Sequence, residues 1–265
     1  MSILPSVKHS LLSRRWIAGH ILITAVVAAC VLLGLWQLRR LGERRALNAT
    51  IVAHSKLAPA PFDQLSSATP SAREADAQAF RVVDAVGTYD RAREVATSPR
   101  SQPAGPGPHV LTPLVTRKGL ALLVDRGSVP LDAPRDAGKA PAGEVRVRGL
   151  LLTAERPSRF GGGSTWRAGT PLRRIDPALV RPALAYPVYP LFLRLETQDP
   201  SQPGGLPAVP PRPALDEGPH FSYAVQWFLF ASVALVGYAV ILRKELRRAA
   251  QDGSDWAEGS APGGI

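Results

Sequence analysis

Residues 16–36 read WIAGHILITAVVAACVLLGLW, and residues 221–242 read FSYAVQWFLFASVALVGYAVIL. Neither stretch contains Asp, Glu, Lys or Arg. Each is about 20 residues long, enough to cross a hydrocarbon core of roughly 30 Å at a rise of about 1.5 Å per residue. A buried helix of a soluble protein normally keeps a polar face at this length. The sequence therefore predicts two transmembrane helices, at residues 16–38 and 220–242.

Clusters of basic residues flank the two apolar stretches, in a chain whose formal net charge is +11. Basic residues at helix ends are typical of topology signals and of contacts with lipid headgroups. No nucleic-acid-binding motif accompanies them. We therefore predict a lipid bilayer as a partner and no nucleic acid. The clustered residues are Lys8, Arg14, Arg15, Arg39, Arg40, Arg44, Arg45, Arg243, Lys244, Arg247 and Arg248.

The basic tail decides the orientation. Four of the six residues after position 242 are Lys or Arg, whereas residues 215–220 include neither, so the positive-inside rule places the C-terminus in the cytoplasm. Two crossings then place the N-terminus there too. The arginines after the first helix count for less, because long segments cross largely regardless of charge. The predicted order is a cytoplasmic N-terminus (1–15), an extracytoplasmic domain (39–219) and a cytoplasmic tail (243–265), with the helices between them.

Cys30 is the only cysteine and lies inside the first apolar stretch. The chain can therefore form neither an internal disulfide nor a cysteine-based metal cluster. Residues 27–30 match a lipoprotein cleavage pattern, but the apolar run continues to Trp36 and is longer than a signal peptide's core of about 7–15 residues. We expect the segment to be a retained anchor.

The region between the helices has strand character. Val145 and Val147 alternate with Arg146 and Arg148, which is typical of a strand with one wet face. We expect a short helix and then loop over 48–79. The predicted fold is a membrane protein whose two transmembrane α-helices flank a predominantly antiparallel β (α+β) extracytoplasmic domain. Its predicted strands are 80–89, 110–116, 120–125, 143–152 and 188–197, the second and third forming a hairpin across 117–119.

Catalytic signatures are absent from the sequence, which has no nucleophile elbow, phosphate-binding loop or metalloprotease motif. Gly161, Gly162 and Gly163 open no evident helix and are interpreted as a flexible loop. His54 and His109 are expected to be exposed at the surface. We therefore expect a protein that is not an enzyme, although an unrecognised site assembled by the fold is a further alternative.

His220 begins the second apolar stretch, at the predicted membrane boundary. His is a common axial ligand of haem iron, and Arg pairs with propionate carboxylates. The alternative is an interfacial aromatic belt with a capping histidine, and the residues alone leave both interpretations open. His20 lies near the opposite membrane face and cannot share a site with His220. Candidate side chains at the depth of His220 are Tyr223 and Trp227 on the second helix and Trp36, Arg39 and Arg40 on the first.

The two helices carry small residues that allow close approach in lipid. On the first helix these are Ala25 and Ala29, at a four-residue spacing. We predict that the helices touch, and that contact brings Trp36 near Trp227 or Tyr223. The second helix offers Ala224, Ala231 and Ala234.

Five segments, in order, resemble the surfeit locus protein 1 family of cytochrome c oxidase assembly factors. They are LGLWQLRR (33–40), VGTYD (86–90), HVLTPLV (109–115), VDRGSVP (124–130) and HFSYAVQWF (220–228). The first and last are the most specific. Three residues depart from the family pattern: Ser128 stands in place of Trp, Asp125 in place of a frequent Asn, and Pro219 in place of Asn.

The resemblance implies a bacterial plasma-membrane protein that binds haem a and helps to insert it into the catalytic subunit of cytochrome c oxidase. It implies His220 as the ligand of the haem iron, and haem a synthase as a further partner. A cofactor-free scaffold that docks on the oxidase subunit during assembly is the alternative function.

Overall fold

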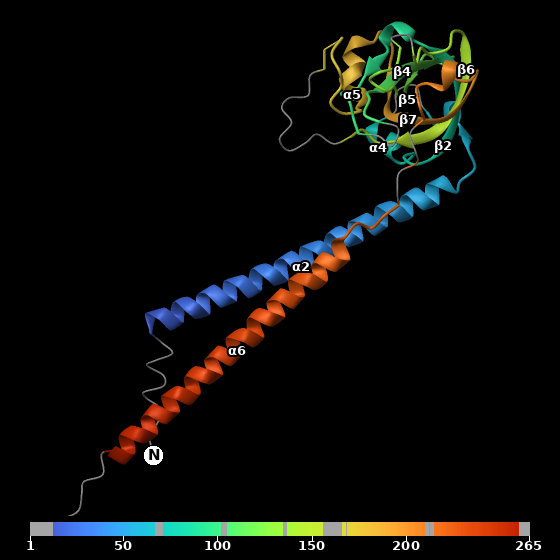
Figure 1. Cartoon of the computed structure of the whole chain (residues 1–265). Coiled ribbons are helices and arrows are strands. Elements are labelled where there is room, and N and C mark those ends of the chain that lie inside the picture. The colour runs from blue at the N-terminus through green and yellow to red at the C-terminus, as the bar shows by residue number, and fades with distance from the viewer. Residues whose placement is uncertain are drawn as a thin grey trace, which may run out of the picture. The chain divides into compact units, whose positions relative to one another are not determined.

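The computed structural model divides the chain into two compact units. One consists of Met1–Asn48 and Leu215–Ile265, and the other of Ala49–Ala214, which we call the β domain. Figure 1 shows the long helices of the first unit and the curved strands of the second. The residues that the structure describes are 13–66, 71–101, 105–134, 137–155, 166–167, 169–209, 212 and 215–259.

Two long helices contain the apolar stretches: α2 (Arg14–Ser55) and α6 (His220–Gly259). Both are long and apolar enough to cross a membrane. Only 11% of the most apolar window of α2 and 6% of that of α6 is buried, whereas a core helix of a soluble protein is mostly buried. Their apolar side chains therefore face outward, as lipid-facing side chains would.

Helix α2 is longer than predicted. Its 42 residues extend roughly 63 Å at 1.5 Å per residue, about twice the thickness of a hydrocarbon core. The short helix expected at the start of 48–79 is present, but residues 48–55 are the continuation of α2 and not a separate helix. Ion pairs along the helix favour the extension, since Arg39 and Arg40 both reach Glu43.

Helices α2 and α6 pack against each other in antiparallel orientation, as predicted. Gln37 contacts His220 near one end of the pair, and His20 contacts Tyr238 toward the other. The buried or partly buried positions recur at spacings of three and four residues, a period typical of left-handed coiled-coil packing. These seam residues include Trp16, His20, Ile23, Val27, Cys30, Gly34, Gln37 and Leu41 on α2, and His220, Ala224, Trp227, Ala231, Ala234 and Tyr238 on α6.

The small residues of α2 that permit this approach are not the predicted ones. Ala25 and Ala29 are exposed, because they lie off the seam. Gly34 is buried instead, and a Cβ built there would lie 2.8 Å from two carbons of the Phe228 ring. Glycine at position 34 therefore makes room for the aromatic ring of the facing helix.

The β domain is built on a closed barrel of five strands. Neighbouring strands pair in the order β2-β6-β7-β5-β4, and β4 pairs back with β2. All of these pairs are antiparallel except β5 with β7. The five strands are β2 (Val82–Tyr89), β4 (His109–Thr116), β5 (Ala121–Ser128), β6 (Glu144–Leu152) and β7 (Val188–Asp199).

Short elements complete the domain. Two of them, β1 and β3, extend the sheet beside β2 and β4. The remaining elements are short helices. The bounds are β1 (Ala60–Pro61), α3 (Phe62–Leu65), α4 (Ala72–Asp76), η1 (Arg91–Arg93), β3 (Val95–Ala96), α5 (Pro177–Val180), η2 (Arg181–Ala183) and η3 (Pro203–Gly205).

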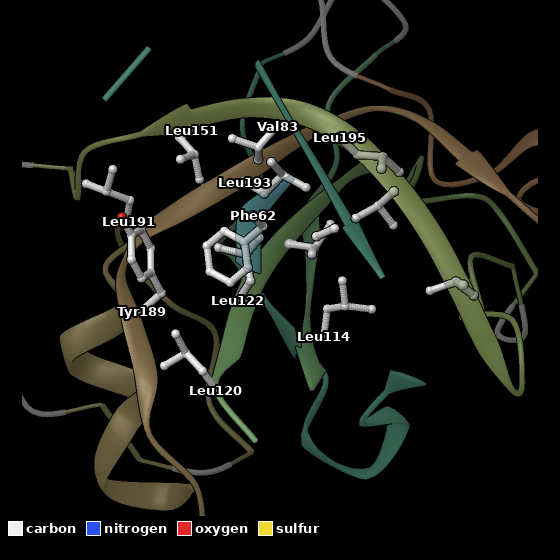
Figure 2. Packing of buried hydrophobic residues seen from close by; sticks show 14 of the residues in the cluster. Phe62, Val83, Leu114, Leu120, Leu122, Leu151, Tyr189, Leu191, Leu193 and Leu195 are labelled. Carbon is white, nitrogen blue, oxygen red and sulfur yellow. The ribbon is translucent and has the colours of Figure 1, made fainter. Parts of the chain in front are cut away.

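Alternating side chains divide the apolar residues into two layers. On β5, Leu122 and Val124 belong to the cluster inside the barrel, whereas Leu123 belongs to a second cluster beside α5. Figure 2 shows the first cluster, including the ring of Phe62 beside that of Tyr189. These two rings meet edge to face with centroids 5.0 Å apart, and each residue is 1% exposed. The barrel is therefore filled by side chains and is not a pore.

The five predicted strands are confirmed, together with the hairpin of β4 and β5. On β6, Val145 and Val147 are buried and Arg146 and Arg148 are exposed, as the alternation predicted. The glycine run at 161–163 lies outside the described residues.

The predicted exposure of two histidines was wrong. His109 is 4% exposed, and its Nδ1 lies 2.9 Å from Oδ1 of the fully buried Asp125. His54 is partly buried in the last turn of α2, with its Nδ1 2.6 Å from the carbonyl oxygen of Ala79. In each case the partner of the histidine comes from another part of the chain. The sequence around each histidine therefore did not indicate that its side chain is buried.

Candidate functional site

The imidazole of His220 is fixed by a residue of the other helix. It is the first residue of α6 and is partly buried at the seam, with Nδ1 2.8 Å from Oε1 of Gln37. An amide oxygen only accepts hydrogen bonds, so Nδ1 is the protonated nitrogen and donates to it. In the neutral imidazole the other ring nitrogen, Nε2, consequently keeps its lone pair. Metal-bound histidines almost always have this arrangement, with the second ring N–H donated to an oxygen.

The turn before α6 leaves space beside that nitrogen. Gly218 has φ 66°, a conformation that favours glycine, and precedes Pro219. The carbonyl oxygen of Pro219 accepts hydrogen bonds from the backbone N–H of Tyr223 and the hydroxyl of Ser222, which secure the first helical turn. A Cβ at Gly218 would lie 3.6 Å from Nε2 of His220, so a longer side chain there would crowd the free nitrogen.

The predicted arginines lie on α2 but are engaged by a neighbour. Arg40 Nη1 lies 2.6 Å from Oε2 of Glu43, and Arg39 Nε lies 3.7 Å from its Oε1. Their side chains are 50% and 77% exposed, so both ion pairs are accessible to water and weak. Either arginine can therefore exchange Glu43 for another anion at little cost.

A second set of charged residues ties the segment before α6 to α2. Arg45 donates two hydrogen bonds, of 2.9 and 2.8 Å, to the carboxylate of Glu217, and these hold the pKa of Glu217 below its ordinary value. Asn48 donates to the carbonyl oxygen of Asp216 at 3.0 Å, and Arg44 lies 3.9 Å from its carboxylate. These contacts anchor the two residues that directly precede the turn at Gly218.

The predicted aromatic residues are not gathered around His220. Trp36 and Tyr223 are 48% and 47% exposed. Trp227 is partly buried at the seam, and its ring packs against Phe230 with centroids 5.9 Å apart. Within the described residues, no ring contact joins Trp36 to Trp227 or Tyr223. Trp36 is displaced because it precedes Gln37, a seam residue, by about 100° around the helix.

Two residues of the site were not predicted from the sequence. Gln37 was seen only as part of a motif, and Gly218 was not considered. The signal for Gln37 is its spacing, since it follows Gly34 by three residues and precedes Leu41 by four, on the seam of α2. A polar side chain on the packed side of an apolar helix usually has a partner. Gly218 carried no signal, because its closeness to His220 depends on the turn.

The donor set fits a haem better than a bare metal ion. In the described part of the chain, no three His, Cys, Asp or Glu side chains group to hold a metal ion. His220 instead offers one imidazole nitrogen beside a residue with no side chain. One axial histidine is enough for a haem, whose porphyrin supplies the other nitrogen donors.

The β domain holds a separate buried polar cluster around Arg126. This side chain is fully buried, and its Nη1 donates to Oε2 of Glu94 at 3.1 Å and to the carbonyl oxygen of Gly138 at 2.8 Å. Its guanidinium carbon lies 5.4 Å from the centre of the Tyr89 ring. Burial lowers the pKa of Arg126 and raises that of Tyr89. Arg126 therefore joins β5 to two loops, a structural role for the VDRGSVP motif.

Comparison with known proteins agrees with the motifs. A model of the SURF1 family matches residues 24–232. An uncharacterized SURF1-like protein of Mycobacterium bovis is 29% identical over 243 residues, covering 89% of this chain and 87% of its own. Uncharacterized SURF1-like proteins of two Mycobacterium tuberculosis strains match with the same identity and coverage. The match spans the β domain and most of both apolar stretches, and the chain belongs to the SURF1 family.

Proposed function

We propose that this protein is a membrane-anchored assembly factor that binds haem a through His220 and assists its insertion into the catalytic subunit of cytochrome c oxidase. The SURF1 family is generally linked to the assembly of this oxidase. The observation that carries the haem proposal is the hydrogen bond from Nδ1 of His220 to Gln37, which leaves Nε2 available. The role is that of a carrier or chaperone and not of an enzyme.

The proposed topology has two crossings of a bacterial plasma membrane, by residues 16–38 and 220–242. Both termini are then cytoplasmic and the β domain is extracytoplasmic. Gln37 and His220 lie at the ends of these spans, at the outer boundary of the bilayer. A haem bound there would have its hydrophobic tail in lipid and its propionates toward water.

The neighbouring side chains have supporting roles in this proposal. Arg39 and Arg40 would pair with the propionates after exchanging Glu43, since both ion pairs are exposed. Trp227, which shares the seam with His220, would contact the porphyrin from the side of the helix pair. Trp36 and Tyr223, which are about half exposed, would pack on the porphyrin from the lipid side. Haem a synthase, as the source of haem a, is the proposed second partner.

The test is the haem content of the full-length protein, purified in detergent from cells that make haem a. The wild type should show haem absorbance, and acid extraction should identify haem a. His220→Ala should lose the haem while remaining inserted and folded, because the substitution is at a helix end. His20→Ala is the matched control, since it removes the seam histidine near the other end of the helix pair, and it should retain haem.

Two results would contradict the proposal. One is haem a in His220→Ala at the wild-type stoichiometry, because His220 would then not be the ligand. The other is wild-type protein that carries no haem but still co-purifies with the oxidase subunit, which would favour the cofactor-free scaffold.

A further inference from the structure

We propose that Gln37 is a positioning residue for the haem ligand: it selects the tautomer of His220 that leaves Nε2 free to bind the iron of a haem. This inference rests on the proposed function. It assigns a role to a residue of α2, 183 positions away from the ligand in the sequence.

The geometry of the contact between Gln37 and His220 determines which tautomer of the imidazole is present. A neutral imidazole carries one proton, on either nitrogen, and only the unprotonated nitrogen can bind a metal. Nδ1 of His220 lies 2.8 Å from Oε1 of Gln37, an oxygen with lone pairs and no hydrogen. The proton is therefore held on Nδ1. If Gln37 were apolar, the proton could also lie on Nε2 and compete with the iron.

The surroundings strengthen this contact. Both residues are partly buried at the seam, so water competes less for Nδ1 than it would at an exposed site. Gln37 lies between the buried residues Gly34 and Leu41 on the seam, so it projects from the side of α2 that packs against α6. The imidazole of His220 thus belongs to α6 and is oriented by a residue of α2.

Because Gln37 and His220 belong to different helices, the strength with which His220 would bind iron also depends on the pairing of α2 and α6. An oxygen acceptor on the second ring nitrogen orients the imidazole and raises its basicity as a ligand. A partner that separated the two helices at this end would remove the acceptor and weaken the bond to the iron. Binding and release of the haem would then depend on the same interhelical contact.

The experiment titrates ferric haem b into the full-length apoprotein in detergent, and measures the dissociation constant and the midpoint potential of the bound haem. Gln37→Leu removes the acceptor at similar size and should weaken binding about 10- to 100-fold, as loss of such a supporting group typically does. Gln37→Glu keeps an acceptor, now anionic. It should retain haem and lower the midpoint potential, because the imidazole becomes a stronger electron donor.

Tyr238→Phe is the control for a purely structural effect, because it removes the polar contact with His20, also between α2 and α6. It should leave both the affinity and the midpoint potential unchanged. Equal weakening by Gln37→Leu and Tyr238→Phe would overturn the inference, since Gln37 would act only through helix pairing. A wild-type midpoint potential in Gln37→Glu would also overturn it.

The two proposals can fail separately. If His220→Ala loses haem b but Gln37→Leu binds it with wild-type affinity, the positioning role is wrong and the haem function stands. If His220→Ala binds haem b as tightly as the wild type, the proposed function itself fails.

Discussion

Single residues in this protein take their roles from partners distant in the sequence. Gln37 and His220 belong to opposite ends of the chain. The position of His220 at the membrane boundary made it a candidate ligand, whereas Gln37 is inconspicuous in its local context as a polar residue at the end of an apolar run. Gly218 has no side chain, and its closeness to Nε2 comes from a turn with positive φ. Two features thus define the site. Gln37 accepts the hydrogen bond from Nδ1 of His220, and Gly218 leaves space beside Nε2.

Gly218→Asn tests the need for that space. Asparagine tolerates positive φ better than most residues, so the backbone should keep its turn while the new side chain crowds Nε2. We expect haem affinity to fall roughly tenfold, equivalent to about 1.4 kcal/mol. Absorbance titration of the detergent-solubilised protein measures it.

Gly204→Asn is the matched control, because Gly204 has the same φ of 66° and a Cβ added there would meet no atom within 4 Å. It should bind haem like the wild type. Equal affinity in both variants would mean that Nε2 is approached from another direction.

At the scale of elements, the sequence predicted the type of each long segment better than its extent. The apolar stretches and the strand alternation gave both helices and all five barrel strands. The extension of α2 to Ser55 was missed, because its contacts with Asp216 and Glu217 come from the far end of the chain. The seam of α2 was also misplaced, because small residues at a four-residue spacing occur on more than one face of the helix.

The packing of Gly34 against Phe228 predicts a compensating pair of substitutions. Gly34→Leu should force the helices apart, since overpacking typically costs about 1–3 kcal/mol, and should lower haem retention by disturbing the contact between Gln37 and His220. Adding Phe228→Ala should restore part of the loss, because it removes the ring that the leucine would meet. Haem stoichiometry after purification is the readout.

Gly19→Leu provides the comparison, since a Cβ at Gly19 meets nothing within 4 Å. Its haem content should match that of the wild type. If Phe228→Ala fails to rescue Gly34→Leu, the ring of Phe228 is not what limits the side chain at position 34.

Glu155 predicts how the β domain responds to acid. Burial opposes its ionisation, but hydrogen bonds from Arg100 and from the backbone N–H of Ile175 outweigh that effect and hold its pKa below the ordinary value. A lowered folded-state pKa gives stability that is fully present above the unfolded-state value of about 4.3 and is lost as the pH falls through the folded-state pKa.

Glu155→Gln should therefore lower the Tm at pH 7 and have a smaller effect near pH 3, below the unfolded-state pKa of about 4.3, where the wild type has begun to lose the same contribution. Thermal unfolding of the full-length protein at the two pH values measures the difference. Equal destabilisation at both would show that the ionised pair with Arg100 contributes nothing.

At the scale of the whole molecule, the closure of the barrel was the least predictable feature. It depends on the pairing of Gly87, Thr88 and Tyr89 with the end of β4, and on the parallel alignment of β5 with β7. Local alternation carries no information about such long-range partners. The burial of His109 beside Asp125 was missed for the same reason, since the strand register and a bulge between Val110 and Leu111 bring the two together.

The membrane topology is the remaining prediction at this scale. Many of the basic residues that follow the first apolar stretch are paired with acids: Arg40 with Glu43, Arg44 with Asp216, and Arg45 with Glu217. These arginines open a segment of far more than about 60 residues, and segments of that length cross largely regardless of their charge. We therefore predict that the basic tail after residue 242 keeps the C-terminus in the cytoplasm.

An alkaline phosphatase fusion at Lys139 should consequently be active, because this enzyme folds only after export. A phosphatase fusion at the C-terminus should be inactive, and a fluorescent protein at the same place should be bright. Replacing the four basic residues that follow position 242 with alanine should reduce the activity of the Lys139 fusion, because the orientation signal is then weakened. An inactive fusion at Lys139 in the unaltered protein would place the β domain in the cytoplasm. His220 would then lie at the inner leaflet, and delivery of haem a from the outer boundary of the membrane would be impossible.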